Sequence, residues 1–156
     1  MARPEQRKAR KDYPEGGIKA GETYWYVKLK TQYGGIVKRS KTPFKASQLT
    51  QSPFKSGWFA VGEDWDASAK DVDAINDAAA DIRSLGEDAQ ASFDSMPEGL
   101  QQGETGQLLE NRASECEDRA DQLEALAMEM ADADDDEDEA ERITDAAGDL
   151  IGDMPE

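Results

Sequence analysis

The charges of this 156-residue chain change sign at one place, close to Gly62. Residues 1–62 carry 13 Lys and Arg against 4 Asp and Glu, a net charge of +9, whereas residues 63–156 carry 5 against 31, a net charge of −26. Such an asymmetry indicates polyelectrolyte partners or attraction between the halves themselves. The hydrophobic fraction is only 37%, below the roughly 45–50% of globular domains, so we do not expect one large core.

Aromatic and cationic side chains gather in residues 21–42, which read GETYWYVKLKTQYGGIVKRSKT. Trp25, Val27 and Leu29 alternate with more polar neighbours, and a period of two in strand-favouring residues is typical of a half-buried β-strand. The stretch Gln32-Tyr33-Gly34-Gly35 has the composition of a turn, and residues 36–42 resume the strand pattern. The sequence therefore predicts a β-hairpin.

The polar positions of this hairpin carry the candidate binding residues. If alternate side chains share a face, Tyr24 and Tyr26 offer two aromatic planes next to the ammonium groups of Lys28 and Lys30, a combination suited to bases and phosphates. The predicted nucleic-acid-binding residues are Tyr24, Tyr26, Lys28, Lys30, Lys38, Arg39 and Lys41. The alternative is that the rings form a core and the lysines protect strand edges, in which case any partner is a protein. The pattern does not distinguish DNA from RNA.

The hairpin lies within a larger N-terminal region that we divide in two. Residues 1–17 are polar and basic, contain Pro4, Pro14 and the pair Gly16-Gly17, and are expected to form a flexible arm with little structure of its own. Residues 18–62 form the basic aromatic β-hairpin module. Within this module residues 46–50 suggest a turn of helix, and large apolar side chains are expected to pack under one hairpin face: Phe44, Phe54, Trp58 and Phe59.

Residues 63–133 are predicted to form an acidic antiparallel helical hairpin. Apolar residues recur there at spacings of three and four, the rhythm of one helical stripe. Residues 64–68 are expected to cap the first helix and Thr105 the second, with a break around Pro97. The predicted helix-interface residues are Val72, Ile75, Ile82, Leu109, Cys116, Leu123, Leu126 and Met130. Residues 134–156 are predicted to be an acidic linker and a short amphipathic helix, and the fold class is α+β.

We expect no catalytic site, no cofactor and no metal. The chain has no histidine, the commonest general base and metal ligand. Asp132, Asp134 and Asp136 have the spacing of the first ligands of a calcium loop, but Glu137 stands where that loop needs glycine and Ile143 where it needs a bidentate carboxylate. The single cysteine lies in a helical stripe without an activating base. A non-enzymatic binding protein is therefore expected.

Neither a signal peptide nor a membrane segment is predicted, because the basic start of the chain is not followed by an apolar region and about 18 apolar residues never run together. We accordingly expect no membrane partner.

Three segments resemble parts of small, largely uncharacterised proteins encoded by bacteriophages. They are KARKDYPEGGIKAGETYWY, SKTPFKASQLTQSPF and SMPEGLQQGETGQLLENR, in the same order as in that group and covering a third of the chain. The hairpin also resembles the small DNA-binding sheets at the arms of phage-type integrases, without their catalytic region. The resemblance implies a phage accessory protein in the host cytoplasm and assigns no site residues.

Three functions are consistent with these observations. The first is a non-enzymatic phage accessory protein that contacts nucleic acid through the hairpin, with the acidic helices serving homodimerisation or docking to a host or phage protein. The second is an inhibitor of a host DNA-binding protein whose acidic helices imitate DNA, by analogy with phage antirestriction proteins of the DNA-mimic kind. The third is a structural or assembly component of the phage.

Overall fold

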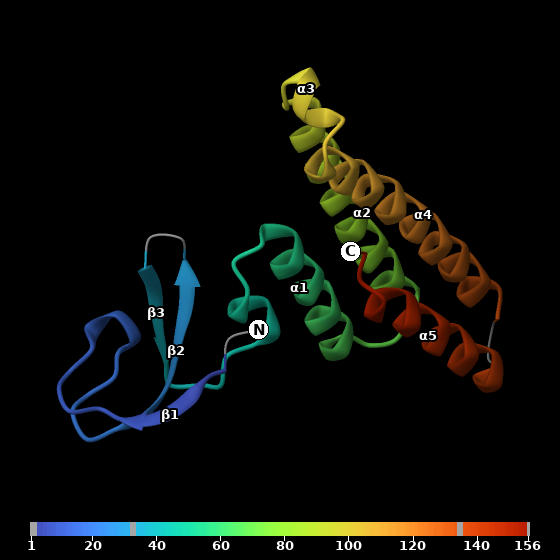
Figure 1. Ribbon diagram of the computed structural model, residues 1–156. Helices are drawn as coiled ribbons and strands as arrows, with labels where there is room; N and C mark the ends of the chain where they lie inside the picture. Colours follow the sequence, from blue (N-terminus) through green and yellow to red (C-terminus); the bar gives the residue numbers. More distant parts are fainter. Residues whose placement is uncertain (1–2, 32–33, 134–135, 156) are drawn as a thin grey trace. The chain divides into compact units, whose positions relative to one another are not determined.

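The computed structural model describes residues 3–31, 34–133 and 136–155. The chain divides into two compact units, residues 1–59 and residues 60–156. The boundary lies within helix α1 (Pro53–Ala67) and close to the place where the charge changes sign. Because residues 60–62 carry no charge, the first unit holds the net +9 and the second the net −26. A strand-rich unit is thus followed by a helical one, which confirms the α+β class (Figure 1).

The first unit contains an antiparallel sheet of three strands in the order β1-β2-β3, namely β1 (Glu5–Lys8), β2 (Thr23–Thr31) and β3 (Gly34–Ser40). Strands β2 and β3 form the predicted hairpin, with Tyr26 opposite Arg39 and Lys30 opposite Gly35. The predicted turn residues Gln32 and Tyr33 lie outside the described residues. The two Gly residues that follow them are the first residues of β3.

The expectation of little structure in residues 1–17 is wrong for the described part of that segment. Residues 5–8 form β1 on β2, and the pairing continues where the amide of Ala9 donates to the carbonyl of Glu22 at 2.8 Å. The chain then turns through the short 3-10 helix η1 (Pro14–Gly16). Strand β1 has no apolar alternation, since all four of its residues are exposed, and its pairing comes from backbone hydrogen bonds that composition does not signal.

Helix α1 begins earlier than expected. A turn of 3-10 helix, η2 (Ala46–Leu49), confirms the helical turn predicted there, and Ser52 then precedes Pro53, the first residue of α1. The carbonyl of Ser52 accepts the amide of Ser56 at 2.9 Å, and proline at the first helical position loses no bond. The helix buries Trp58, Val61 and Trp65, a spacing of three and four that marks it in the sequence.

The expected cap in residues 64–68 is wrong because α1 continues to Ala67 and a new helix, α2 (Val72–Asp94), begins after it. The carboxylate of Asp71 caps α2 by accepting the amide of Ala74 at 2.9 Å. Helix α3 (Glu98–Gln101) and helix α4 (Glu104–Asp132) follow the predicted break. Thr105 is not the cap of α4, because the helix begins one residue before it and Gly103 stands at the cap position. A side chain on Gly106 would meet the carbonyl of Gln101, so the turn into α4 is too tight for a larger residue.

Helices α2 and α4 run antiparallel, as predicted. Arg83 of α2 meets Asp121 and Glu124 of α4, and three residues later Gly86 meets Cys116, earlier in α4. A Cβ on Gly86 would lie 2.8 Å from the Cβ of Cys116, so the helices approach closely there. Figure 1 shows the two helices side by side along their length.

The last helix, α5 (Glu137–Gly152), is the predicted short amphipathic helix. Asp136 caps it by accepting the amide of Glu139 at 3.2 Å. Ile143, Ala147 and Ile151 are buried at a spacing of four. A Cβ on Gly148 would lie 3.6 Å from Nε1 of Trp65. The second half of α1 therefore packs beside α5. Asp134 and Asp135 of the predicted acidic linker lie outside the described residues.

Candidate nucleic-acid interface

The register of the sheet assigns each side chain to a face. Residues directly opposite one another share a face, so Tyr24 and Tyr26 of β2 lie on the face of Arg7 from β1 and Arg39 from β3. The alternation along β2 extends this face to Lys28 and Lys30, as predicted for these four β2 residues. We call this surface the cationic face, and define it as Arg7, Tyr24, Tyr26, Lys28, Lys30 and Arg39. Glu5, which stands opposite Tyr26, lies on the same side of the sheet.

Lys38 does not belong to the cationic face. It stands opposite Val27, whose face is the buried one, since Val27 and Leu29 are 1% and 4% exposed. From that side Nζ of Lys38 donates to the carbonyl of Gln48 in η2 at 2.9 Å. The prediction that Lys38 and Arg39 act on one surface is therefore wrong, because neighbouring residues of a strand point to opposite faces.

The tyrosine rings are packed within the unit rather than displayed. Tyr24 is 5% exposed and forms a small core with Ala9 and Ile18, and its ring centroid lies 5.5 Å from that of Tyr13. The prediction that Tyr24 offers a plane for stacking is wrong, because the segment after β1 covers it. Tyr26 remains half-buried, at the edge of this core.

Two arginines lie over tyrosine rings. The guanidinium carbon of Arg7 is 3.8 Å from the ring centroid of Tyr26, and that of Arg39 is 4.4 Å from the ring centroid of Tyr13. A cation over an aromatic face is attracted to its negative centre and loses mobility. The rings thus hold the arginines in place. Arg7 also pairs with Glu5 at 2.8 Å, and this hydrogen bond raises the pKa of the guanidinium.

Lys28 and Lys30 keep the exposure that was predicted for them. Neither side chain has an ion pair among the described residues. Lys28 extends across Gly35 of β3, since a Cβ on Gly35 would lie 2.5 Å from Cε of the lysine. Nε2 of Gln51 donates to the backbone carbonyl of Lys30 at 2.6 Å, which ties the segment before α1 to the edge of β2.

Two hollows in the first unit have cationic walls. One, of about 620 Å³, is lined by Arg3, Lys28, Leu29, Lys30, Leu49, Thr50 and Gln51. The other, of about 720 Å³, is lined by Arg7, Lys8, Ala9, Arg10, Tyr13 and Tyr24. Each contains three cations, and no carboxylate is among the described lining residues of either. Lys8 and Arg10 belong to the basic arm whose charge extends that of the hairpin, but neither they nor Arg3 were among the seven predicted binding residues.

Lys41 follows the end of β3 and pairs with Glu22 at 3.2 Å. The carboxylate of Glu22 also accepts the amide of Lys19 at 2.7 Å, and this bond, with Lys41, lowers the pKa of Glu22. Of the seven predicted binding residues, the structure therefore brings Tyr26, Lys28, Lys30 and Arg39 together on an accessible face, with Tyr24 buried beneath it. Lys38 lies on the opposite face of the sheet, and Lys41 lies beyond the end of β3.

The predicted helix-interface residues fall into two groups. Ile75, Ile82, Cys116 and Leu123 are fully buried. The other four are half-buried: Val72, Leu109, Leu126 and Met130. Burial raises the pKa of the Cys116 thiol to about 11, so this thiol is protonated at neutral pH and is a poor nucleophile.

An ion-pair cluster that was not predicted joins α2 to α4. Arg83 contacts Glu117 at 3.5 Å and Asp121 at 2.8 Å, and also Glu124. The contact with Arg83 lowers the pKa of Glu124. Arg83 is the only cation of α2, and a lone cation on an acidic helix was the signal that the sequence offered.

Comparison with known proteins gives no relative: no family model, no curated protein and no solved structure matches the chain. Within the described residues, no group of three or more Cys, Asp or Glu side chains is arranged to hold a metal ion. None of the described helices combines the length and the apolar character needed to cross a membrane.

Proposed function

We propose that the protein is a non-enzymatic nucleic-acid-binding protein whose first unit contacts the phosphate backbone. The observation that carries this proposal is the pair of hollows walled by Arg3, Lys28 and Lys30 and by Arg7, Lys8 and Arg10, without a carboxylate among their described lining residues. Cations that line a hollow without carboxylates attract phosphates and release the counterions condensed on them.

Contact with phosphates fits the geometry better than contact with bases. The ring of Tyr24 is buried and the ring of Tyr26 is already covered by Arg7, so neither presents a free plane for stacking. Backbone contacts position a protein on a nucleic acid but carry no sequence information. The proposed binding is therefore independent of base sequence and strongly dependent on salt.

The setting of this activity is part of the proposal. The resemblance to small bacteriophage proteins supports an accessory protein that acts in the host cytoplasm. In that setting the second unit serves dimerisation or docking to a protein partner.

The test is the salt dependence of binding to a labelled oligonucleotide of mixed sequence, measured by fluorescence anisotropy with the full-length protein. We expect the affinity to fall steeply with salt. The double variant Lys28→Gln, Lys30→Gln is expected to reduce the slope of log K against log salt by about 2, or about 1 for each phosphate that is no longer neutralised. Lys55→Gln is the matched control, because Lys55 is exposed on α1 and lines neither hollow.

The single variants Lys28→Gln and Lys30→Gln are compared with Lys55→Gln. If all three reduce the affinity for the oligonucleotide equally, only the net charge matters, and the proposal of a binding site at the hollows is wrong. Absence of binding at low salt, together with displacement of a DNA-binding protein from DNA, would instead favour the acidic inhibitor. The net −26 of the second unit is the observation that keeps this second function open.

A further inference from the structure

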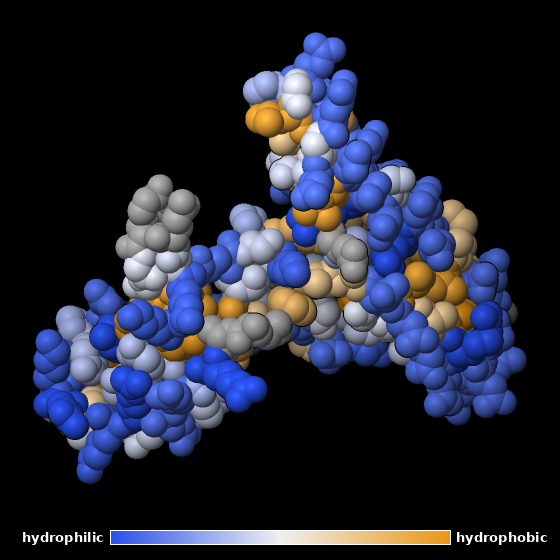
Figure 2. Space-filling view, in the orientation of Figure 1, coloured by the Kyte–Doolittle hydropathy of each residue, from blue (hydrophilic) through white to orange (hydrophobic). Residues whose placement is uncertain are grey.

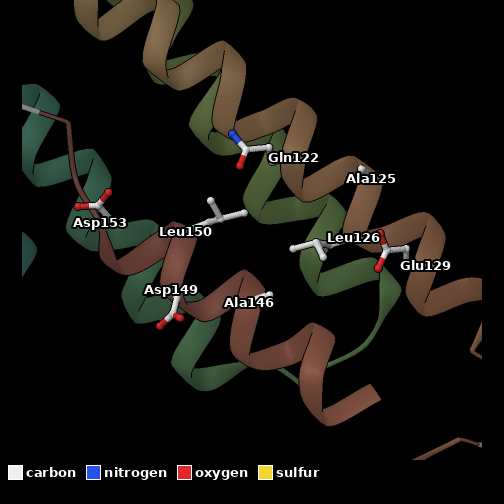
Figure 3. A pocket seen from close by; sticks show the side chains of 8 residues that line it. All are labelled: Gln122, Ala125, Leu126, Glu129, Ala146, Asp149, Leu150 and Asp153. Carbon is white, nitrogen blue, oxygen red and sulfur yellow. The ribbon is translucent and has the colours of Figure 1, made fainter. Parts of the chain in front are cut away.

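A groove runs between α4 and α5 in the second unit. It has a volume of about 580 Å³ and is lined by Gln122, Ala125, Leu126, Glu129, Ala146, Asp149, Leu150 and Asp153. Figure 3 shows Leu126 of α4 and Leu150 of α5 pointing into the space between the two helices. In Figure 2 an apolar patch lies between these helices, surrounded by hydrophilic residues.

The groove exists because only part of the apolar stripe of α5 is covered by the rest of the unit. Ile143, Ala147 and Ile151 are fully or nearly fully buried. Ala146 and Leu150, each one position before a buried residue, are turned toward the adjacent face of the helix and stay half-buried. On α4, Leu126 is half-buried in the same way beside the buried Ala127. Two helices therefore leave apolar side chains facing a common open space.

The rim of the groove is acidic. Glu129, Asp149 and Asp153 line it, and no cation is among the described lining residues. A guanidinium nitrogen of Arg142 lies 2.9 Å from a carboxylate oxygen of Glu129, and one of Arg119 lies 3.1 Å from a carboxylate oxygen of Asp153. Two of the three carboxylates therefore form ion pairs with arginines that do not line the groove. Asp149 has no ion pair among the described residues. With a net charge of −26 on the unit, the potential around the groove is negative and repels nucleic acid.

We propose that this groove binds a basic amphipathic helix of a partner protein. An amphipathic helix places apolar anchors at positions i, i+3 or i+4, and i+7 into an apolar groove, which here is the floor of Leu126, Ala146 and Leu150. Lysines and arginines on the flanks of such a helix meet the acidic rim, and charge complementarity of this kind speeds association and selects the partner. The inference concerns the second unit and does not depend on the proposed nucleic-acid contact.

The test uses a labelled synthetic peptide of about 18 residues, which is five helical turns, with leucine at the anchor positions and lysine elsewhere. Binding to the full-length protein is measured by fluorescence anisotropy at about 0.15 M salt, where the Debye length is about 8 Å. Control peptides carry glutamate in place of lysine, or serine in place of leucine. We expect binding of the first peptide alone.

Variants of the groove locate the binding. Leu126→Gln is expected to weaken binding of the peptide by about tenfold or more, because it removes a central apolar contact of the groove. Met128→Gln is the matched control, since Met128 lies on α4, outside the lining residues, and is 69% exposed. Ala125 is exposed, so Ala125→Arg and Ala125→Glu do not disturb packing and differ mainly in charge. The arginine variant is expected to weaken binding more than the glutamate variant.

Three results overturn the proposal. The first is equal binding of the leucine-containing and serine-containing peptides. The second is equal effects of the Leu126 and Met128 changes, or of the two Ala125 changes. The third is a dimer of the free protein, seen by sedimentation, that Ala125→Arg dissociates and the peptide displaces, because the occupant is then a second copy of the chain. Circular dichroism of each variant shows whether the helices are intact, and the Ala125 pair keeps the test valid if Leu126→Gln unfolds.

Discussion

The two units of this protein present hollows of opposite character. In residues 1–59 the hollows have cationic walls, whereas in residues 60–156 the groove has an acidic rim and lies between helices. One chain thus offers one surface suited to polyanions and another suited to basic partners.

The units share one rule despite their opposite signs, which is that most of the minority charges make internal contacts. In the basic unit Glu5 pairs with Arg7, and Glu22 pairs with Lys41. In the acidic unit Arg83, Arg119 and Arg142 each contact two or more carboxylates. Lys70 lies 4.3 Å from the ring centroid of Trp65. Minority charges are therefore engaged within each unit, whereas some majority charges, such as those of Lys28, Lys30 and Asp149, have no ion pair among the described residues.

The largest expected effect tests whether apolar packing, rather than charge, holds the acidic unit together. Ile82→Ala removes a fully buried side chain and is expected to destabilise the protein by about 2–5 kcal/mol. Met128→Ala changes an exposed residue and is expected to shift the free energy of unfolding by no more than about 0.5 kcal/mol. Urea denaturation followed by circular dichroism measures both. Similar small effects would mean that burial in the helical unit is not what stabilises it.

The next effect concerns the close approach of α2 and α4. Gly86→Ala places a Cβ 2.8 Å from the Cβ of Cys116 and 3.3 Å from the carbonyl of Ala113. Overpacking of this kind costs about 1–3 kcal/mol, against a gain of about 1 kcal/mol in helix propensity. We expect a net loss of stability in thermal unfolding. Gly152→Ala, at a helical glycine with open space around it, is the control and should not lower the Tm.

A smaller effect tests the rule of minority and majority charges directly. Arg83→Gln leaves three carboxylates of α4 without their shared cation and is expected to lower the Tm, most of all at low salt. Lys55→Gln removes a majority charge from the basic unit and is expected to leave the Tm unchanged. A lower Tm for the lysine variant alone would reverse the rule.

The smallest effect is on individual carboxyl groups and is measured by NMR titration. The pKa of Glu124 is lowered from its ordinary 4.5 by Arg83, and that of Asp81 is raised from its ordinary 3.8, first by burial and then by Asp64 and Asp77. Glu124 therefore adds stability above pH 4.5 that is lost as the pH falls through its lowered pKa. Asp81 has the opposite effect on stability. Because its pKa is higher in the folded protein, its contribution to stability is largest below pH 3.8 and is lost as the pH rises through the raised pKa. Arg83→Gln should return the pKa of Glu124 toward 4.5 and leave that of Asp81 unchanged.

Much of the fold could be predicted because periodicity reports burial. The alternation around Val27 and Leu29 predicted β2, and the stripe through Ile75 and Ile82 predicted α2. Strand β1 was not predicted, because it is held by backbone hydrogen bonds to β2 and by the contact of Arg7 with the ring of Tyr26, which is far away in the sequence. The start of α1 was missed because residues 53–62 were assigned to the hairpin module, whereas Pro53, after Ser52, is the first residue of a helix.

The candidate site was predicted less well than the fold. Lys38 and Arg39 are neighbours in one strand, so their separation onto two faces followed from the sequence and was overlooked. The burial of Tyr24 did not follow from it, because the cover comes from Ala9 and Ile18, whose position depends on how the chain turns through η1. Long-range cover of this kind has no local signal.

The burial of Cys116 makes the chain its own reporter of helix separation. The thiol has no exposed surface where α4 faces Gly86 of α2, so a maleimide dye reacts only with molecules whose two helices have come apart. Since this is the single cysteine, the labelling rate counts those opening events without any engineered site. A partner that stabilises the packing of α2 against α4 would slow the labelling of Cys116, and a partner that favours separation of the two helices would speed it.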